Sequence, residues 1–150
     1  MNVTASQIRQ DFNYFGGFGQ QGYGYNVEYL YKEIGEILGI YEGYTTVIIG
    51  AGNLGKALAN YAGFEKRGFK LVGIFDNNPE KIGTEVNNVT VLDIENLETF
   101  VENNRVDIGI LAVPKAEAEN IASRLSECGV KGLLNFCYTD IKTNHNTIIE

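Results

Sequence analysis

From residue 45 onward, short runs of apolar residues alternate with stretches in which apolar residues recur every three or four positions. Short apolar runs are typical of buried strands, and the other spacing is typical of helices with one apolar face. The runs predict strands over residues 45–49, 70–76, 89–92, 106–113 and 132–136. Because strands that alternate with helices indicate βαβ units, we predict an α/β fold, a Rossmann-like parallel sheet with helices on both faces.

Two of the predicted helices lie between these strands. Apolar residues at 94, 97, 100 and 101 share one helical face, and those at 118, 121, 122, 125 and 128 share another. Asp93 is a candidate cap for the first helix, and Pro114 ends the preceding strand where the second helix begins. The run 107–113 is nearly continuous in apolar residues, which predicts a central strand covered on both faces.

The residues before position 45 have a different pattern. Thr4 and Gln7 form a capping box, which predicts a short helix over 5–14. A loop rich in glycine and aromatic residues follows over 16–25, and its glycines allow either a hairpin-like or an irregular conformation. Asn26 is a candidate cap for a second helix with an apolar stripe. We therefore expect one segment over 1–40, a linker over 41–44 and a separate domain over 45–150.

A glycine motif directly follows the first predicted strand. Its residues are Gly50, Ala51, Gly52, Asn53, Leu54 and Gly55. In the phosphate-binding turn of a dinucleotide fold, the first glycine permits a tight turn and the second lets the backbone approach a pyrophosphate. The third allows close packing of helix on strand. Because 18 of the 150 residues are glycine, a purely structural turn is the alternative. The position between a strand and a helix favours the nucleotide site.

An acidic residue supports the nucleotide interpretation. Asp76 ends the second predicted strand about 20 residues beyond the glycines, where the ribose-binding acid of such a unit is expected. Its carboxylate can accept hydrogen bonds from ribose hydroxyls and would repel a 2′-phosphate, so a preference for NAD(H) over NADP(H) is predicted. The alternative is that Asp76 only begins the turn formed with Asn77, Asn78 and Pro79.

Composition and charge narrow the classes of function. Twelve basic and 19 acidic residues give a net charge of −7, which opposes non-specific attraction to nucleic acid or anionic lipid. No apolar stretch reaches the roughly 18 residues of a membrane span, so a cytoplasmic protein with no membrane partner is expected. Cys128 and Cys137 lack metal-ligand spacing and are expected to be reduced. No pair of residues suggests catalysis, so neither an enzyme nor a metal site is predicted.

Several segments form a set that is more specific than the glycine motif alone. They are ASQIRQDFNYFG at 5–16, GYGYNV at 22–27, the glycine motif followed by ALANY at 57–61, FD at 75–76 and LAVP at 111–114. In this order, and over nearly the whole chain, they resemble the Rex family of bacterial redox-sensing transcriptional repressors.

The resemblance implies a homodimer that reads the NADH/NAD+ ratio and leaves operator DNA when NADH binds. It implies a partial winged-helix DNA-binding segment over 1–40, with the recognition helix over 4–14 and the wing over 16–25. It also implies that the cofactor contacts the glycine motif and Asp76, that Ala112 and Pro114 line the cofactor crevice, and that Tyr61 lies near the nicotinamide. The implied DNA-binding residues are Thr4, Ser6, Gln7 and Arg9.

Alternatives to these assignments stay open. Tyr61 is otherwise a plain aromatic residue at a helix end, and Arg9 a solvated helix residue. Relative to the family pattern, the chain begins inside the winged helix and stops before a swapped C-terminal helix. Since Arg9 and Asp11 are the only charged side chains in residues 1–25, we expect specific DNA affinity to be lost and NAD binding to be kept. The other class of function is a small NAD- or CoA-binding Rossmann domain of an enzyme.

Overall fold

The computed structural model describes residues 19–20, 24–25, 43–137, 139–143 and 146–150. The chain divides into two compact units, Met1–Glu42 and Gly43–Glu150. In the first unit, β1 (Gly19–Gln20) pairs with β2 (Gly24–Tyr25) in antiparallel register, which confirms a hairpin in the glycine-rich loop. The helices predicted over 5–14 and 27–38 lie outside the described residues, and so do Thr4, Ser6, Gln7 and Arg9.

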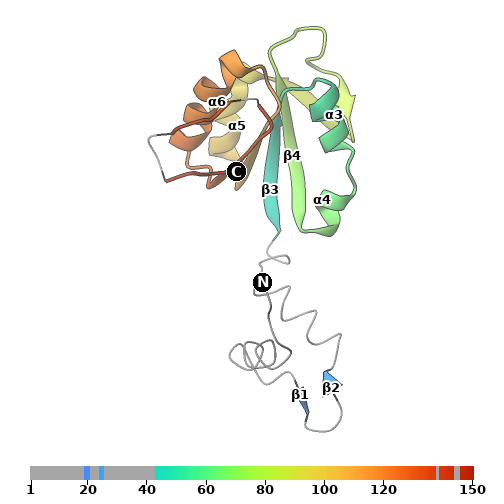
Figure 1. Ribbon diagram of the computed structural model, residues 1–150. Helices are drawn as coiled ribbons and strands as arrows, with labels where there is room; N and C mark the ends of the chain where they lie inside the picture. Colours follow the sequence, from blue (N-terminus) through green and yellow to red (C-terminus); the bar gives the residue numbers. More distant parts are fainter. Residues whose placement is uncertain (1–18, 21–23, 26–42, 138, 144–145) are drawn as a thin grey trace. The chain divides into compact units, whose positions relative to one another are not determined.

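The second unit is built on a seven-stranded sheet (Figure 1). Its strand order is β5-β6-β4-β3-β7-β8-β9, and all neighbouring strands are parallel except β5 and β6. The bounds are β3 (Tyr44–Ile49), β4 (Phe69–Asp76), β5 (Glu85–Val86), β6 (Val89–Asp93), β7 (Ile108–Leu111), β8 (Gly132–Asn135) and β9 (Ile148–Ile149). The order β6-β4-β3-β7-β8 is that of a doubly wound dinucleotide fold, which confirms the predicted fold class.

Helices cover both faces of this sheet (Figure 1). One face carries α3 (Asn53–Ala59) and α4 (Gly63–Lys66), and the other carries α5 (Leu97–Asn103) and α6 (Lys115–Glu127). A 3-10 turn, Ile94–Asn96, precedes α5. Side chains of a strand alternate between faces, so Ile48 joins the core beneath α3 while Val47 and Ile49 join the core beneath α5 and α6. A strand buried on both sides needs the nearly continuous apolar runs seen in the sequence.

Local signals explain several helix ends. The side chain of Asp93 accepts a hydrogen bond of 3.0 Å from the backbone N–H of Glu95, which confirms the predicted cap. Pro114 has extended backbone directly before α6, as expected of a residue that ends a strand. Gly129 lies just beyond α6 with φ +83°, a left-handed conformation that glycine adopts without strain. The ends of α6 are therefore set by local chemistry.

One predicted strand was too long. β7 covers Ile108–Leu111 rather than 106–113, because the N–H of Ala112 donates the last bond to β3, at Ile49, and the chain then turns along the crevice described below toward α6. Cys128 directly follows α6 and packs, partly buried, against the core that also contains Ile121 and Leu125, which confirms its predicted place on the apolar face of this helix.

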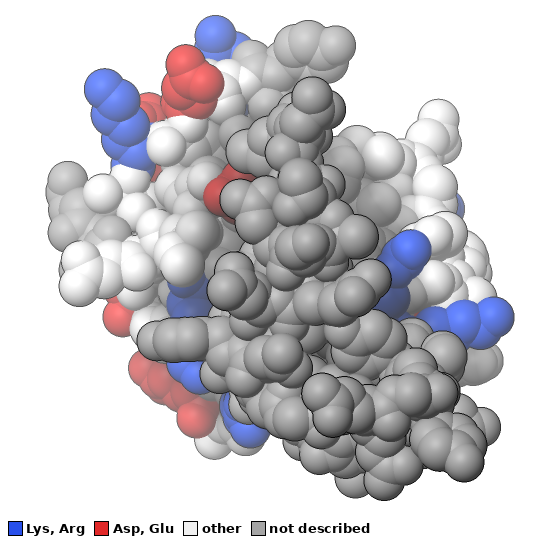
Figure 2. All heavy atoms as spheres, turned by 60° about the horizontal axis from the view of Figure 1, so that its bottom comes forward, with Lys and Arg blue, Asp and Glu red and all other residues white. Residues whose placement is uncertain are grey.

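The helix lengths and surface charges of the described residues bear on contacts with a membrane and with DNA. Within the described ranges, no helix is both long enough and apolar enough to cross a membrane. On the face drawn in Figure 2, the Lys and Arg side chains of the described residues are scattered among acidic and neutral ones. Binding to duplex DNA depends on cations that neutralise several phosphates together.

Asp107 ties three strands together at the amino end of the sheet. Its buried carboxylate accepts a hydrogen bond of 3.1 Å from the backbone N–H of Thr45 and forms ion pairs with Arg105 and Lys131 at 3.1 and 3.3 Å. Burial alone raises the pKa of Asp107, but hydrogen bonds from Thr45, Arg105 and Lys131 outweigh it and hold the pKa below its ordinary value. The ionised form therefore stabilises the starts of β3, β7 and β8.

Asp107→Asn is expected to lower the free energy of unfolding by about 1–3 kcal/mol at pH 7, because the charge that Arg105 and Lys131 pair with is lost. Both cations are largely exposed, which limits the cost. The folded pKa lies below the unfolded value of about 3.9, so the contribution is complete above that pH and is lost as the pH falls through the folded pKa. Urea denaturation of both chains should thus give a difference that shrinks below about pH 4. An equal loss in Asp140→Asn, an exposed aspartate, would contradict this account.

Candidate functional site

A crevice opens at the carboxyl end of β3. The chain leaves β3 toward α3 on one face of the sheet, and leaves the neighbouring β7 toward α6 on the other face (Figure 1). Such a reversal leaves a gap beyond the strand ends, where α/β proteins bind ligands. The crevice has a volume of about 430 Å³. It is lined by Ile49, Gly50, Gly52, Asp76, Asn77, Asn78, Lys81, Ile94, Ala112, Val113, Pro114, Glu117 and Ile121.

Two glycines of the motif are required by the protein itself. Gly50 has φ +103°, and a Cβ at this position would overlap with the carbonyl oxygen of Ala112. A Cβ at Gly55 would overlap with the carbonyl oxygen of Gly50. The backbone of the turn after β3 therefore packs against the backbone at Ala112 and against the backbone at Gly55. Only glycine leaves room for these two contacts.

The middle glycine of the motif is different. Gly52 has φ −77°, which any residue adopts, and a Cβ there would meet no atom within 4 Å. Gly52 lines the crevice and precedes α3, which begins without a side-chain cap. The first N–H groups of a helix have no partner within the helix, so they favour an anionic acceptor. The open space on the Cβ side of Gly52 thus lies beside the backbone N–H groups that begin α3.

Asp76 is the buried acid of the crevice. Its Oδ2 accepts hydrogen bonds from the backbone N–H of Ala51 at 2.7 Å and from the Nζ of Lys81 at 3.0 Å, and its Oδ1 accepts one from the N–H of Asn78 at 2.9 Å. Burial by itself raises the pKa of Asp76, but the bonds from Asn78, Lys81 and Ala51 outweigh it and leave the pKa below its ordinary value. Asp76 is therefore an ionised acceptor, linked to the glycine motif through Ala51.

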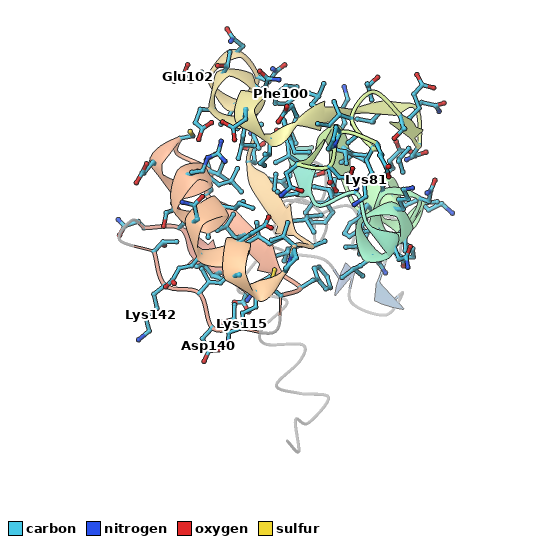
Figure 3. The ribbon with its side chains drawn as sticks, turned by 90° about the horizontal axis from the view of Figure 1, so that it is seen from above. Lys81, Phe100, Glu102, Lys115, Asp140 and Lys142 are labelled. Atoms are coloured by element: carbon cyan, nitrogen blue, oxygen red, sulfur yellow. The ribbon has the colours of Figure 1, made fainter. Side chains whose placement is uncertain are left out.

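Lys81 and Glu117 are site residues that sequence reasoning missed. The backbone N–H of Lys81 donates to the carbonyl of Asn78 at 2.9 Å, and this turn brings the lysine back to Asp76. Seen from the carboxyl edge of the sheet, Lys81 lies far from Lys115, so the two lysines do not share a site (Figure 3). Glu117 accepts a bond of 3.4 Å from the side chain of Asn77. The sequence offers only a weak signal for a role of Lys81 in the site, namely its position five residues after Asp76.

The structure brings most of the predicted cofactor residues together, with one exception. Gly50, Gly52, Asp76, Ala112 and Pro114 line one crevice. Ala51 donates to Asp76, Gly55 packs behind the turn, and Asn53 and Leu54 begin α3. Tyr61 does not line the crevice. It packs edge-on against Phe64, accepts a hydrogen bond of 3.2 Å from Arg67 and lines a separate cavity of about 100 Å³. Its place near a nicotinamide stays a prediction.

Comparisons with known proteins find relatives over the whole chain. A family model described as CoA binding domain matches residues 42–139. The redox-sensing transcriptional repressor Rex of Thermoanaerobacter sp. (strain X514) is 56% identical over 150 residues, which are 100% of this chain and 67% of that protein.

Solved structures agree with this relationship. The crystal structure of RSP, a Rex-family repressor, in complex with β-NAD+ and operator DNA has a TM-score of 0.89 and 55% identity, over 99% of this chain and 68% of that chain. The structure of RSP with β-NADH has a TM-score of 0.85 and 51% identity, over 99% and 69%. The chain thus spans about two thirds of the length of these proteins.

Gly55 and Gly52 of the motif are expected to differ in their effect on stability. Gly55→Ala should lower the free energy of unfolding by about 2–3 kcal/mol, because the new methyl group meets a backbone oxygen that cannot move aside. Gly52→Ala should change it by less than about 0.5 kcal/mol, because the methyl group enters open space. Chemical denaturation of the two variants measures both values, and equal losses would show that the glycines share one structural role.

Proposed function

The chain belongs to the Rex family of redox-sensing transcriptional repressors, and we propose that it binds NAD(H) in the crevice at the end of β3. We propose further that its N-terminal segment binds operator DNA and that NADH releases the DNA. RSP, at 55% identity, has been solved with β-NAD+ and operator DNA, which supports both parts of the proposal. The relatives are regulators rather than enzymes, so a binding function is expected of these residues in place of catalysis.

The observation that carries the proposal is the open space at Gly52. Neither the backbone conformation nor the packing of the protein requires glycine there. A ligand that passes close to the backbone does require it, and in dinucleotide folds that ligand is the pyrophosphate. We therefore place the pyrophosphate above Gly52, against the N–H groups that begin α3, with Gly50 to Gly55 as its binding turn.

The adenosine is placed on the Asp76 side of the crevice. The Oδ1 of Asp76 accepts one bond from protein, so an acceptor position remains for a ribose hydroxyl. Ile94, Ala112, Val113, Pro114 and Ile121 supply an apolar lining suited to a base. This arrangement assigns Ala112 and Pro114 to the cofactor site, as the family resemblance implies.

The contact with DNA is assigned to Thr4, Ser6, Gln7 and Arg9 of a partial winged-helix segment over 1–40, and the cofactor to a domain over 45–150. We propose a cytoplasmic homodimer, because a two-fold symmetric dimer reads paired half-sites of an operator. NADH weakens DNA binding only as far as it prefers the released conformation to the DNA-bound one. A few kcal/mol of such preference is enough for a switch.

Coenzyme A is the second candidate ligand, because the family model that matches residues 42–139 is described as CoA binding domain. Its adenosine carries a 3′-phosphate, which would approach the ionised Asp76. Repulsion between the two anions disfavours it relative to the free hydroxyls of NAD(H). Competition of CoA with bound NADH distinguishes the candidates.

Gly52→Val is expected to weaken NADH binding by at least about 100-fold, roughly 3 kcal/mol, because the side chain fills the space proposed for the pyrophosphate. Isothermal titration calorimetry measures the affinity, and circular dichroism checks the fold. The matched control is Gly132→Val, because Gly132 has no positive φ, a Cβ there would meet no atom closer than 3.9 Å, and the residue lies outside the crevice lining. Native-like Gly52→Val with unchanged NADH affinity would place the cofactor elsewhere.

Operator binding is tested with the DNA of the RSP complex at fixed salt. Because Arg9 is the single cation in residues 1–25, we expect weak binding by the 150-residue chain. A chain extended to the length of its relatives should bind tightly with NAD+ and more weakly with NADH. Gel-shift titrations of both chains with each cofactor give the four affinities. Tight binding by the 150-residue chain that NADH does not alter would contradict the expectation of weak binding. An extended chain whose operator binding NADH does not alter would remove the redox-sensing proposal.

A further inference from the structure

Three charged side chains line the crevice in the described part of the chain, namely Asp76, Lys81 and Glu117. Asp76 and Lys81 form an ion pair at 3.0 Å, so Lys81 offsets part of the Asp76 charge for a group that approaches from the crevice. The Lys81 side chain is one-third exposed and would attract a phosphate placed beside Asp76. Asp76 with its paired lysine is therefore a weaker barrier to a nucleotide with a 2′-phosphate than an unpaired carboxylate would be.

Glu117 supplies charge that Lys81 does not balance. It lies in the first turn of α6, four residues before Ile121, and both side chains line the crevice. Its carboxylate accepts a bond of 3.4 Å from Asn77, the residue directly after Asp76. The half-buried carboxylate is thus held toward the loop that carries the ribose-binding acid. Among the described residues, no Lys or Arg forms an ion pair with Glu117.

We propose that Glu117 is a second specificity-determining acid of the crevice, which excludes dinucleotides that carry a 2′-phosphate on the adenosine ribose. The inference rests on the proposed binding of NAD(H) at this site. In this inference, the low affinity for NADP(H) results from acidic side chains on two walls of the crevice. Asp76 occupies the position of the 2′-phosphate on the β4 side, and Glu117 repels the phosphate from the α6 side.

Electrostatics set the expected size of the effect. A phosphate monoester carries a charge of about −1.5 to −2 at neutral pH. A single carboxylate at roughly 8 Å, with an effective dielectric constant of about 40 and partial screening by salt, changes the affinity of such a group by about five- to twentyfold. NADH has no charge at the 2′-position, so its affinity should change much less.

The test compares NADH and NADPH affinities in the wild-type chain, Glu117→Gln and Glu119→Gln, by calorimetry at low and high ionic strength. Gln keeps an oxygen that accepts the bond from Asn77 and removes only the charge. Glu119 is the matched control, an exposed glutamate on the same helix outside the crevice lining. Glu117→Gln should raise the NADPH affinity relative to NADH by about five- to twentyfold at low salt and less at high salt. Glu119→Gln should leave the ratio within about twofold of wild type.

A second variant identifies the group that receives the phosphate. In the Glu117→Gln background, Lys81→Met should remove most of the gained NADPH affinity, because the phosphate then lacks its cation. An NADPH-to-NADH ratio that Glu117→Gln leaves unchanged overturns this inference while NADH binding still supports the proposed function. An equal change in Glu119→Gln also overturns it, since a general charge effect would then explain the data. Absence of NADH binding to the wild-type chain would instead overturn the proposed function itself.

Discussion

The close packing of backbone on backbone at the end of β3 is the constraint on which the rest of the structure depends. Gly50 lies against the carbonyl of Ala112 at the end of β7, and Gly55 lies against the carbonyl of Gly50. These two contacts hold the turn, α3 and β7 at the spacing that defines the crevice. A side chain at Gly50 would push the turn away from the end of β7, and one at Gly55 would push α3 away from the turn. Gly52, the middle glycine of the motif, makes no such contact, and for that reason its presence indicates a ligand.

Two buried aspartates stabilise opposite ends of the same sheet. Asp107 holds the amino ends of β3, β7 and β8 and faces cations that are mostly solvated. Asp76 lies at the carboxyl end, where it accepts bonds from Ala51, Asn78 and Lys81. Both have a pKa below the ordinary value for the same reason, since several donors favour the ionised form more than burial opposes it. The difference in role follows from position, because only Asp76 lies on the crevice.

The described lining of the crevice supplies binding energy, which is what a sensor uses. It joins a turn for an anion, an acid for a hydroxyl and an apolar lining, and each of these contributes binding energy without activating a bond. In a sensor, such energy is useful when it differs between two conformations of the protein. Asp76 and Lys81 lie on one wall of the crevice and Glu117 on the other. In the inference above, these charges determine which nucleotide binds.

The sequence by itself determined where five main strands lie along the chain, the cap at Asp93, the glycine turn and the acid that ends β4. These features depend on local chemistry or on a regular apolar pattern, and both can be recognised from a short stretch of sequence.

The tertiary structure alone decided the side-chain contacts of the crevice and of the amino end of the sheet. The pairing of Asp76 with Lys81 depends on a turn, that of Asn77 with Glu117 on residues 40 apart, and that of Asp107 with Thr45 on residues 62 apart. It also placed Tyr61 on a different cavity from the crevice. No pattern along the chain specifies these distances, because they are set by how the strands and helices pack once the sheet has formed.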